Sequence, residues 1–315
     1  MKKKMWAYLM HLSDNMWADS GATVHPTSAQ YHSELSVDEK VWKETIDYLP
    51  LQGINTVLID IGDAIQYESH PEISIKGAWS KDKFKKELDR MRAMGLTPLP
   101  KLNFSAGHDI WLGVYSRMVS TPQYYQVCKD IILEIIELFD TPEYFHLGLD
   151  EETYGYQSTL AYCCIRHGDL WWHDAYYLFD ICEKAGVRPW VWSDYCWHHP
   201  ETFLEKMPKS VLQSNWWYNK IRKNPDGSYK EVQYGTYRVL EEAGFDQVPC
   251  CSTIEGYHSS AYATMQMGRE EIAPERLIGY MTAPWCNPRK HDGLELMNDA
   301  YRFGVAKKEF YPEEV

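Results

Sequence analysis

Residues 144–152 read Tyr-Phe-His-Leu-Gly-Leu-Asp-Glu-Glu, an apolar run that leads into three consecutive carboxylates. A buried strand does not tolerate three acids in its middle, so we expect a strand that ends at Asp150 and delivers acid groups to a cleft. Side chains alternate along a strand, which predicts that His146, Gly148 and Asp150 share one face. The glycine would leave room there for a ligand. A solvated acidic loop is the alternative, and the alternation before Asp150 favours the strand.

Seven other segments have the same strand-like character, and amphipathic helical patterns separate them. The predicted strands cover residues 5–12, 54–61, 96–102, 144–150, 187–192, 211–217, 247–254 and 277–283. Helix N-cap signals stand at Ser36, where a capping box begins, at Ser80 and at Thr121. Eight strand–helix units in 315 residues predict an α/β fold, a single-domain (β/α)8 TIM barrel over residues 1–315. A doubly wound sheet is the alternative, because sequence does not show closure.

The composition limits the classes of partner. A net charge of −13 makes nucleic acid and anionic membrane surfaces poor partners. Thirteen Trp and 23 Tyr suit a carbohydrate substrate, because aromatic rings stack on the apolar faces of sugars. No stretch approaches the length of a membrane span, and the first residues do not resemble a signal peptide. The eight Cys form no Cys-x-x-Cys motif, so we expect reduced thiols and a cytoplasmic location, with the oligomeric state left open.

Polar residues stand at the predicted strand ends. The carboxyl ends of the strands form the rim that holds the active site of (β/α)8 barrels. The residues at these ends are Asp60, Asp63, Lys101, Asn103, Asp150, Glu151, Asp194, Asn215, Glu255 and Asn287. We therefore expect the acids among them to converge on one cleft.

Asp150 and Glu151 are the candidate catalytic residues. Two neighbouring carboxylates repel each other, so one of them should hold its proton well above its ordinary pKa. A charged carboxylate beside a protonated one is the arrangement that glycoside hydrolysis uses. The sequence has no Gly-rich phosphate loop, no dinucleotide-binding fingerprint and no Gly-x-Ser-x-Gly motif, so the enzyme classes that use them are not indicated.

The motif His146-x-Gly148-x-Asp150-Glu151 resembles the His-x-Gly-Gly-Asp-Glu motif of glycoside hydrolase family 20, the β-N-acetylhexosaminidases and their relatives. Residues 100–108, Pro-Lys-Leu-Asn-Phe-Ser-Ala-Gly-His, resemble that family's Pro-Glu-x-Asp-x-Pro-Gly-His segment. The positions that correspond in strand order to the family's sugar-cage tryptophans are Trp192, Trp216 and Trp285. The resemblance extends, in order, over essentially the whole barrel.

This resemblance implies an exo-acting glycosidase that hydrolyses a small N-acetylhexosamine-containing or related glycan with retention, without metal or cofactor. Glu151 would be the general acid that protonates the leaving oxygen. Asp150 would orient the substrate's 2-acetamido group, which attacks the anomeric carbon in place of an enzyme nucleophile. His108 would belong to a polar relay behind the acid, and His146 would be a buried, hydrogen-bonded support. The other predicted substrate contacts are Asp60, Asn103, Trp192, Asp194, Trp216, Glu255, Tyr257 and Trp285.

Several positions depart from the family pattern. Lys101 and Asn103 stand where the family has Glu and Asp, so a relay through His108 would lack its carboxylate. Residues 5–13 contain no arginine to bind sugar hydroxyls. Leu149 replaces the second Gly, and alternation directs it toward the helices. These departures bear on the hexosamine substrate more than on the glycosidase class.

Three alternative functions remain open. A retaining glycosidase of another specificity would use Glu151 as acid/base and Glu255 as nucleophile, unless Glu255 only pairs with a cation such as Arg289. A sugar-binding protein without turnover would keep the barrel and the cleft. A metal-dependent sugar isomerase or epimerase would surround a divalent ion with His, Asp and Glu from several strand ends, but His198-His199 and His291 lack the spacing of metal ligands.

Overall fold

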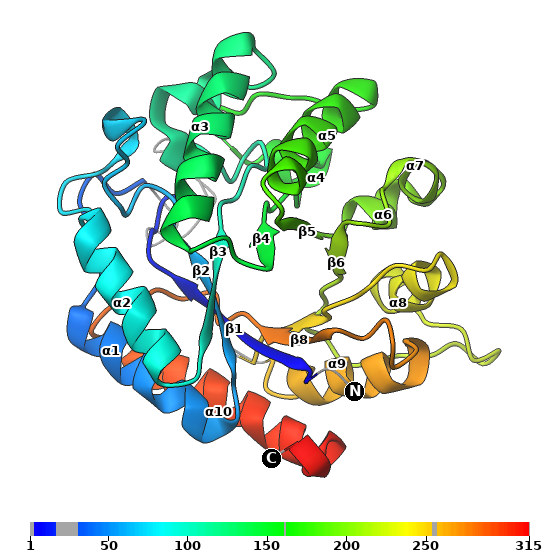
Figure 1. Ribbon diagram of the computed structural model, residues 1–315. Helices are drawn as coiled ribbons and strands as arrows, with labels where there is room; N and C mark the ends of the chain where they lie inside the picture. Colours follow the sequence, from blue (N-terminus) through cyan, green and yellow to red (C-terminus); the bar gives the residue numbers. More distant parts are fainter. Residues whose placement is uncertain (1–2, 17–30, 161, 254–256, 315) are drawn as a thin grey trace.

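The computed structural model describes residues 3–16, 31–160, 162–253 and 257–314. Its centre is one sheet of parallel strands, surrounded by helices (Figure 1). The strands are β1 (Met5–His11), β2 (Thr56–Asp60), β3 (Thr97–Lys101), β4 (Tyr144–His146), β5 (Arg188–Trp192), β6 (Leu212–Ser214), β7 (Cys250–Cys251) and β8 (Gly279–Thr282). Each lies within its predicted range, and the predicted parallel (β/α)8 barrel is confirmed.

The sheet curves until its two edge strands meet. Its hydrogen-bonded order is β6-β5-β4-β3-β2-β1-β8-β7. Between β6 and β7, isolated parallel bridges join Gln213 to Gln247 and Trp216 to Cys250. The Cys250 N–H also donates to the Asn215 carbonyl at 2.9 Å. The sheet is therefore a nearly closed barrel and not the open, doubly wound alternative.

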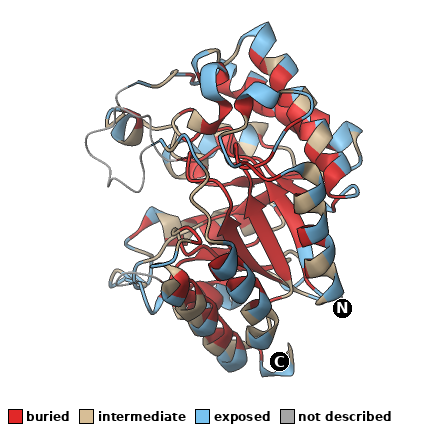
Figure 2. Cartoon of the chain, turned by 90° about the vertical axis from the view of Figure 1, so that its left-hand side faces the viewer, coloured by how far each residue is buried: buried red, intermediate tan, exposed pale blue. Residues whose placement is uncertain are grey.

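The helices form the outer layer of the barrel. They are α1 (Glu39–Tyr48), α2 (Lys81–Ala93), α3 (Pro122–Leu138), α4 (Tyr154–Gln157), α5 (Asp169–Lys184), α6 (Tyr195–His198), α7 (Pro200–Lys206), α8 (Val232–Glu242), α9 (Ser260–Glu271) and α10 (Gly293–Phe310). Figure 2 shows that buried residues fill the strands and that exposed residues lie on the outer faces of the helices. A segment capable of crossing a membrane is not found among the described helices.

The N-cap residues of α2 and α3 agree with the sequence predictions, and that of α1 does not. Ser80 and Thr121 cap α2 and α3 as predicted, each accepting a hydrogen bond from the backbone N–H three residues later. The predicted cap at Ser36 is wrong, because Asp38 caps α1 and accepts from two backbone N–H groups. A carboxylate at this position also interacts favourably with the helix dipole. The Ser36 hydroxyl donates instead to the Asp14 carboxylate.

Two prolines in β3 limit its hydrogen bonds to β4. The Leu102 N–H donates to the His146 carbonyl at 3.0 Å, so even-numbered residues of β3 face β4. Pro98 and Pro100 have the same parity and offer no N–H group to that neighbour. The register between β3 and β4 consequently contains the single pair Lys101–His146. The prediction that this strand continues to Asp150 is wrong.

Strand alternation sorts the apolar side chains into two clusters. The outer cluster, between strands and helices, includes Trp6, Tyr8, Val57, Ile59, Phe145 and Leu147. The inner cluster fills the barrel and includes Ala7, Leu9, Leu58, Leu99, Trp190, Leu212, Val248 and Met281. Trp192 belongs to the inner cluster, and Trp216 and Trp285 pack against it. The three candidate sugar-contacting tryptophans therefore face away from the helix layer.

Candidate active site

The backbone after β4 adopts a conformation that decides where the acids lie. Gly148, Leu149 and Glu151 have positive φ angles of 75°, 68° and 54°. Strand alternation thus stops after His146, and the predicted common face of His146, Gly148 and Asp150 is wrong. Leu149 packs in the outer cluster, as predicted.

Gly148 makes room for a protein side chain, not for a ligand as the sequence suggested. A Cβ at this position would lie 1.9 Å from Asn103 Oδ1. The amide of Asn103 donates from Nδ2 to Asp150 Oδ1 at 2.9 Å. The glycine therefore admits the side chain that holds the candidate catalytic aspartate.

Asp150 is fixed by the loop that follows β3. The Ser105 hydroxyl donates to Asp150 Oδ1 at 2.8 Å and accepts the Asp150 N–H at 2.7 Å. The Ser105 N–H donates to Asn103 Oδ1 at 3.0 Å, which orients the Asn103 amide toward the acid. Two donors on one oxygen suit a carboxylate that acts through its negative charge.

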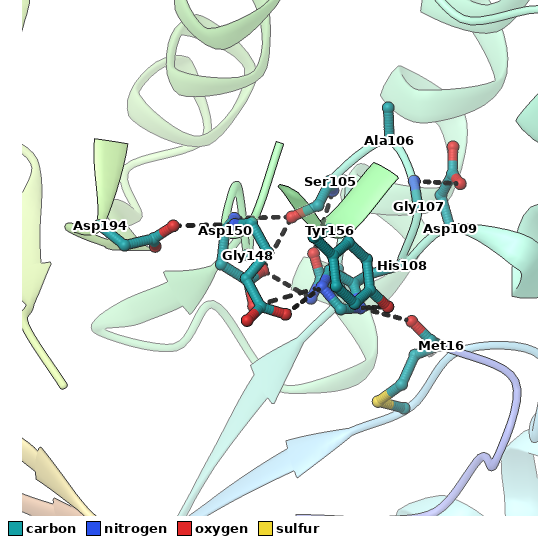
Figure 3. Close-up of polar contacts among 12 residues, drawn as sticks. Met16, Ser105, Ala106, Gly107, His108, Asp109, Gly148, Asp150, Tyr156 and Asp194 are labelled. Atoms are coloured by element: carbon teal, nitrogen blue, oxygen red, sulfur yellow. Dashed lines mark hydrogen bonds and ion pairs between the residues drawn. The ribbon is translucent and has the colours of Figure 1, made fainter. Parts of the chain in front are cut away.

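His108 contacts both candidate catalytic carboxyls, and Figure 3 shows it beside Asp150 and Tyr156. Its Nε2 lies 3.2 Å from Glu151 Oε2 and 3.7 Å from Asp150 Oδ2. On the other side of the ring, Nδ1 lies 2.9 Å from the Met16 carbonyl, and the Tyr156 ring stacks on the imidazole at 4.7 Å. Although burial alone would lower the pKa of His108, the Asp150 and Glu151 carboxylates raise it to about 9. A backbone carbonyl thus supports His108, where the family resemblance implies a carboxylate.

Asp194, between β5 and α6, holds the backbone of Glu151. The Glu151 N–H donates to Asp194 Oδ2 at 2.8 Å. Burial, together with the negative charge of Asp150, raises the pKa of Asp194 to about 8. The raised pKa favours the protonated form of Asp194, and its hydrogen bond to the Glu151 backbone is a role that its place in the sequence did not indicate.

Arg166 clamps the loop that carries the acids. Its guanidinium donates from Nε and Nη2 to both carboxylate oxygens of Glu152, at 3.0 and 2.7 Å. It also donates to Asp174 Oδ2 on α5 at 2.8 Å and to the Phe104 carbonyl at 2.7 Å. The side chains of Arg166, Glu152 and Asp174 are at most 3% exposed. The third acid of the Asp-Glu-Glu run is therefore a structural anchor.

A buried layer of four polar side chains crosses β1 to β4. The strand register aligns His11, Asp60, Lys101 and His146 in that order. Lys101 forms an ion pair with Asp60, and His11 Nδ1 lies 3.5 Å from Asp60 Oδ2. The Gly148 N–H donates to His146 Nδ1 at 3.1 Å, which leaves the proton of the neutral ring on Nε2. Burial, with the charge of Lys101, lowers the pKa of His146 well below its ordinary value.

Five aromatic side chains at or beyond the carboxyl ends of β5, β6, β7 and β8 are linked by ring contacts and one hydrogen bond. The rings of Trp192 and Trp285 lie 6.0 Å apart, and Trp216 stacks on Tyr218 at 5.5 Å. The Trp285 indole donates to the Tyr218 hydroxyl at 2.9 Å, and Tyr218 contacts Tyr257 at 5.7 Å. The structure thus joins four of the predicted substrate contacts, and Tyr218 links them.

The predicted site residues fall into three groups. Those near the acids are Asn103, His108, Asp150, Glu151 and Asp194, and those in the aromatic group are Trp192, Trp216, Tyr257 and Trp285. Asp60 and His146 lie in the buried layer, with the Asp60 carboxylate already paired with Lys101. Glu255 lies outside the described residues.

Sequence reasoning missed several residues that hold the acids in place. They are Met16, Ser105, Tyr156 and Arg166. Each lies in a loop or in the one-turn helix α4, where the surrounding sequence has no periodic hydrophobic pattern. Only Ser105 lies in a segment, residues 100–108, that resembles a family motif.

No protein-family model matches the sequence, and no curated protein matches it. Solved structures match over nearly the whole chain. A glycoside hydrolase family 20 exo-β-N-acetylglucosaminidase from Vibrio harveyi, in complex with N-acetylglucosamine, is 15% identical over 99% of this chain, with a TM-score of 0.64. The family 20 β-N-acetylhexosaminidase from Streptomyces coelicolor A3(2) is 12% identical over 97% of the chain, with a TM-score of 0.63. Dispersin B is 14% identical over 98%, with a TM-score of 0.57.

The chain spans only part of the length of some of these proteins. It covers 58% of the Vibrio harveyi enzyme and 64% of the Streptomyces coelicolor enzyme, but 99% of Dispersin B. At identities of 15% or less, this likeness concerns the architecture. The chain therefore shares its (β/α)8 fold with these family 20 structures.

Proposed function

We propose that the protein is a divergent, exo-acting glycosidase related to glycoside hydrolase family 20 that hydrolyses an N-acetylhexosamine-containing or related glycan. The observation that carries this proposal is the pair of acids after β4, with Asp150 held by Asn103 and Ser105 and with Glu151 beside His108. The architecture shared with family 20 structures and the resemblance of residues 146–151 to that family's motif support the same assignment.

Asp150 serves as the anionic partner of the substrate's 2-acetamido group. Its Oδ1 is occupied by two protein donors, and its Oδ2 faces His108. A fixed carboxylate can orient the acetamide N–H and stabilise the positive charge that develops as the acetamide oxygen attacks the anomeric carbon. The protein then needs no nucleophile of its own.

Glu151 serves as the acid and then the base. Its side chain is 36% exposed, against 11% for Asp150, so its carboxyl is the more accessible to a leaving oxygen. His108 holds a proton up to a pH of about 9, so the His108–Glu151 pair carries a transferable proton at neutral pH. Glu151 protonates the departing oxygen and later accepts a proton from the attacking water.

The test compares two aryl glycosides. The proposal predicts turnover of 4-nitrophenyl N-acetyl-β-glucosaminide, little turnover of the matching β-glucoside, and inhibition by a thiazoline that mimics the cyclised intermediate. Turnover of the plain glucoside without thiazoline inhibition would favour an enzyme nucleophile instead. Sugar binding without turnover of any glycoside would favour a non-catalytic sugar-binding barrel.

A further inference from the structure

The three side chains proposed for catalysis have a second property, which is the geometry of a metal-binding site. Among the described residues, His108, Asp150 and Glu151 form the one group of His, Cys, Asp or Glu whose ligand atoms all lie within 4.8 Å of one another. Nε2 of His108 is 3.2 Å from Glu151 Oε2 and 3.7 Å from Asp150 Oδ2. Ligand atoms around a tetrahedral zinc ion, at bond lengths of about 2.0–2.1 Å, lie roughly 3.3–3.4 Å apart. The observed separations bracket this value.

We infer that His108, Asp150 and Glu151 bind a divalent transition-metal cation of the zinc class, and that the bound cation blocks the glycosidase reaction. The second half of this inference rests on the proposed function. The sequence led us to expect no metal, and the cation inferred here takes no part in turnover.

The surroundings of the three side chains orient them for a cation. Nδ1 of His108 faces the Met16 carbonyl, which places the ring proton on Nδ1 and the lone pair of the neutral ring on Nε2. Asp150 Oδ1 is held by Asn103 and Ser105, which leaves Oδ2 directed at Nε2. The geometry is thus set before a cation binds, and only a proton must be displaced from His108.

The donor set favours zinc over magnesium or calcium. Imidazole nitrogens and carboxylate oxygens are both zinc ligands, and catalytic zinc sites have three protein ligands, whereas magnesium and calcium prefer six or more oxygen ligands. Two carboxylates also balance the charge of a divalent cation. The partial exposure of Glu151 leaves a fourth position for water or for a substrate oxygen.

A cation at this position would prevent catalysis directly. It would occupy the Glu151 oxygen that transfers the proton and the Asp150 oxygen that faces the acetamide. Zinc should therefore compete with protonation of the acid and with the substrate's 2-acetamido group.

The test measures binding without turnover. The full chain is treated with a chelator, the chelator is removed, and ZnCl2 is titrated by calorimetry, with MgCl2 in a parallel titration. We expect one zinc per chain and no comparable magnesium binding. His108→Asn and Glu151→Gln should each weaken zinc binding about 100-fold or more, because each removes a ligand. Glu151 is partly exposed, so its variant tests the site if the His108 variant fails to fold.

Two control proteins separate this site from other zinc ligands. Cys163 and Cys164 are half-buried neighbouring thiols, and thiols can bind zinc. If zinc binds to His108, Asp150 and Glu151 instead, the double variant Cys163→Ser/Cys164→Ser should give the same titration as wild type. His291→Asn removes a histidine that is 75% exposed and should also change nothing. Loss of zinc binding in the cysteine variant, or full binding by His108→Asn and Glu151→Gln, would overturn the inference.

The outcome for zinc is separable from the outcome for glycosidase activity. Zinc binding in a protein that turns over no glycoside contradicts only the proposed function. Turnover that persists unchanged at saturating zinc contradicts only the inferred inhibition.

Discussion

The backbone N–H of Glu151 donates to Asp194 Oδ2 at 2.8 Å, which ties the candidate acid to a buried carboxyl from the next strand. Glu151 needs this tie, because its φ of 54° lies in the left-handed region that a residue with a side chain rarely adopts. Asp194 therefore positions Glu151 through its backbone.

The pKa of Asp194 predicts how stability changes with pH. Its ordinary value of 3.8 is raised to about 8 in the folded protein, so the folded chain binds this proton more tightly than the unfolded chain. The resulting stabilisation is complete below the unfolded value and is lost as the pH rises through the folded value. In Asp194→Asn, the free energy of unfolding from urea titrations should fall less steeply between pH 4 and pH 8 than in wild type. Burial also raises the pKa values of Asp63 and Asp109 to about 7. These two groups contribute to the pH dependence of stability in both proteins, so the variant should keep part of the wild-type slope. Parallel curves would show that Asp194 does not hold this proton.

Glu151→Gln should bind substrate and lose turnover. The variant keeps the size of the side chain but cannot protonate the leaving oxygen, so kcat should fall by about 10²–10⁴-fold for an oligosaccharide. The loss should be smaller for 4-nitrophenyl N-acetyl-β-glucosaminide, because its leaving group needs little protonation. Steady-state kinetics on both substrates, with calorimetric binding of the product sugar, measure the difference. Equal losses on both substrates would argue against a role as general acid.

Asp150→Asn should harm only substrates that carry a 2-acetamido group. The amide has the shape of the carboxylate but not its charge, so it cannot stabilise the cyclised intermediate. Comparison of kcat/KM for the aryl N-acetylglucosaminide and the aryl glucoside isolates this effect. An equal loss on both would indicate that Asp150 acts on the anomeric carbon itself.

Gly148→Ala should disturb the candidate active site in addition to straining the backbone. A methyl group there would collide with Asn103 Oδ1, which belongs to the side chain that holds Asp150. Gly95→Ala is the matched control, because Gly95 has a φ of 79° and no heavy atom within 4 Å of a Cβ. Both variants should lose roughly 1–2 kcal/mol from left-handed strain. Only Gly148→Ala should also lower kcat/KM, and equal activity in both would show that Asn103 can move without consequence.

Arg166→Met should destabilise the fold strongly. It leaves Glu152 and Asp174 buried without their counter-ion, a change that typically costs about 3–5 kcal/mol. Lys76→Met is the control, because Lys76 and its partner Glu34 are 77% and 64% exposed, so the loss of this surface pair should change stability little. The free energies of unfolding of the two variants test the contrast, and similar values would mean that Arg166 is not a clamp.

The sequence predicted the barrel because each strand carries its own signal. Apolar runs of strand length alternate with capped helical patterns, and the caps at Ser80 and Thr121 form as predicted. The end of β4 could not be predicted from its own apolar alternation, because the backbone turns to positive φ at Gly148 and Leu149, where Asn103 from the loop after β3 packs against the glycine. Strand boundaries in a sheet depend on both partners.

The catalytic candidates of the site could be predicted from the sequence, but the residues that hold them in place could not. Asp150, Glu151 and His108 stand in motifs, and the structure brings them together. Arg166 lies 14 residues after Glu152 in a segment without periodicity, and only tertiary packing joins the two side chains. The Met16 carbonyl carries no residue-specific signal at all, because any residue offers the same group.

The buried ion pair between Lys101 and Asp60 also constrains how this chain can evolve. A change of Lys101 to the glutamate of the family pattern would place two carboxylates side by side inside the barrel, where the His11 imidazole beside Asp60 could offset only one of the two charges. A change of Asp60 alone would strand an ammonium group in the same place. Substitutions at the two positions should therefore be correlated among relatives of this protein. Such correlated changes would keep the net charge inside the barrel constant.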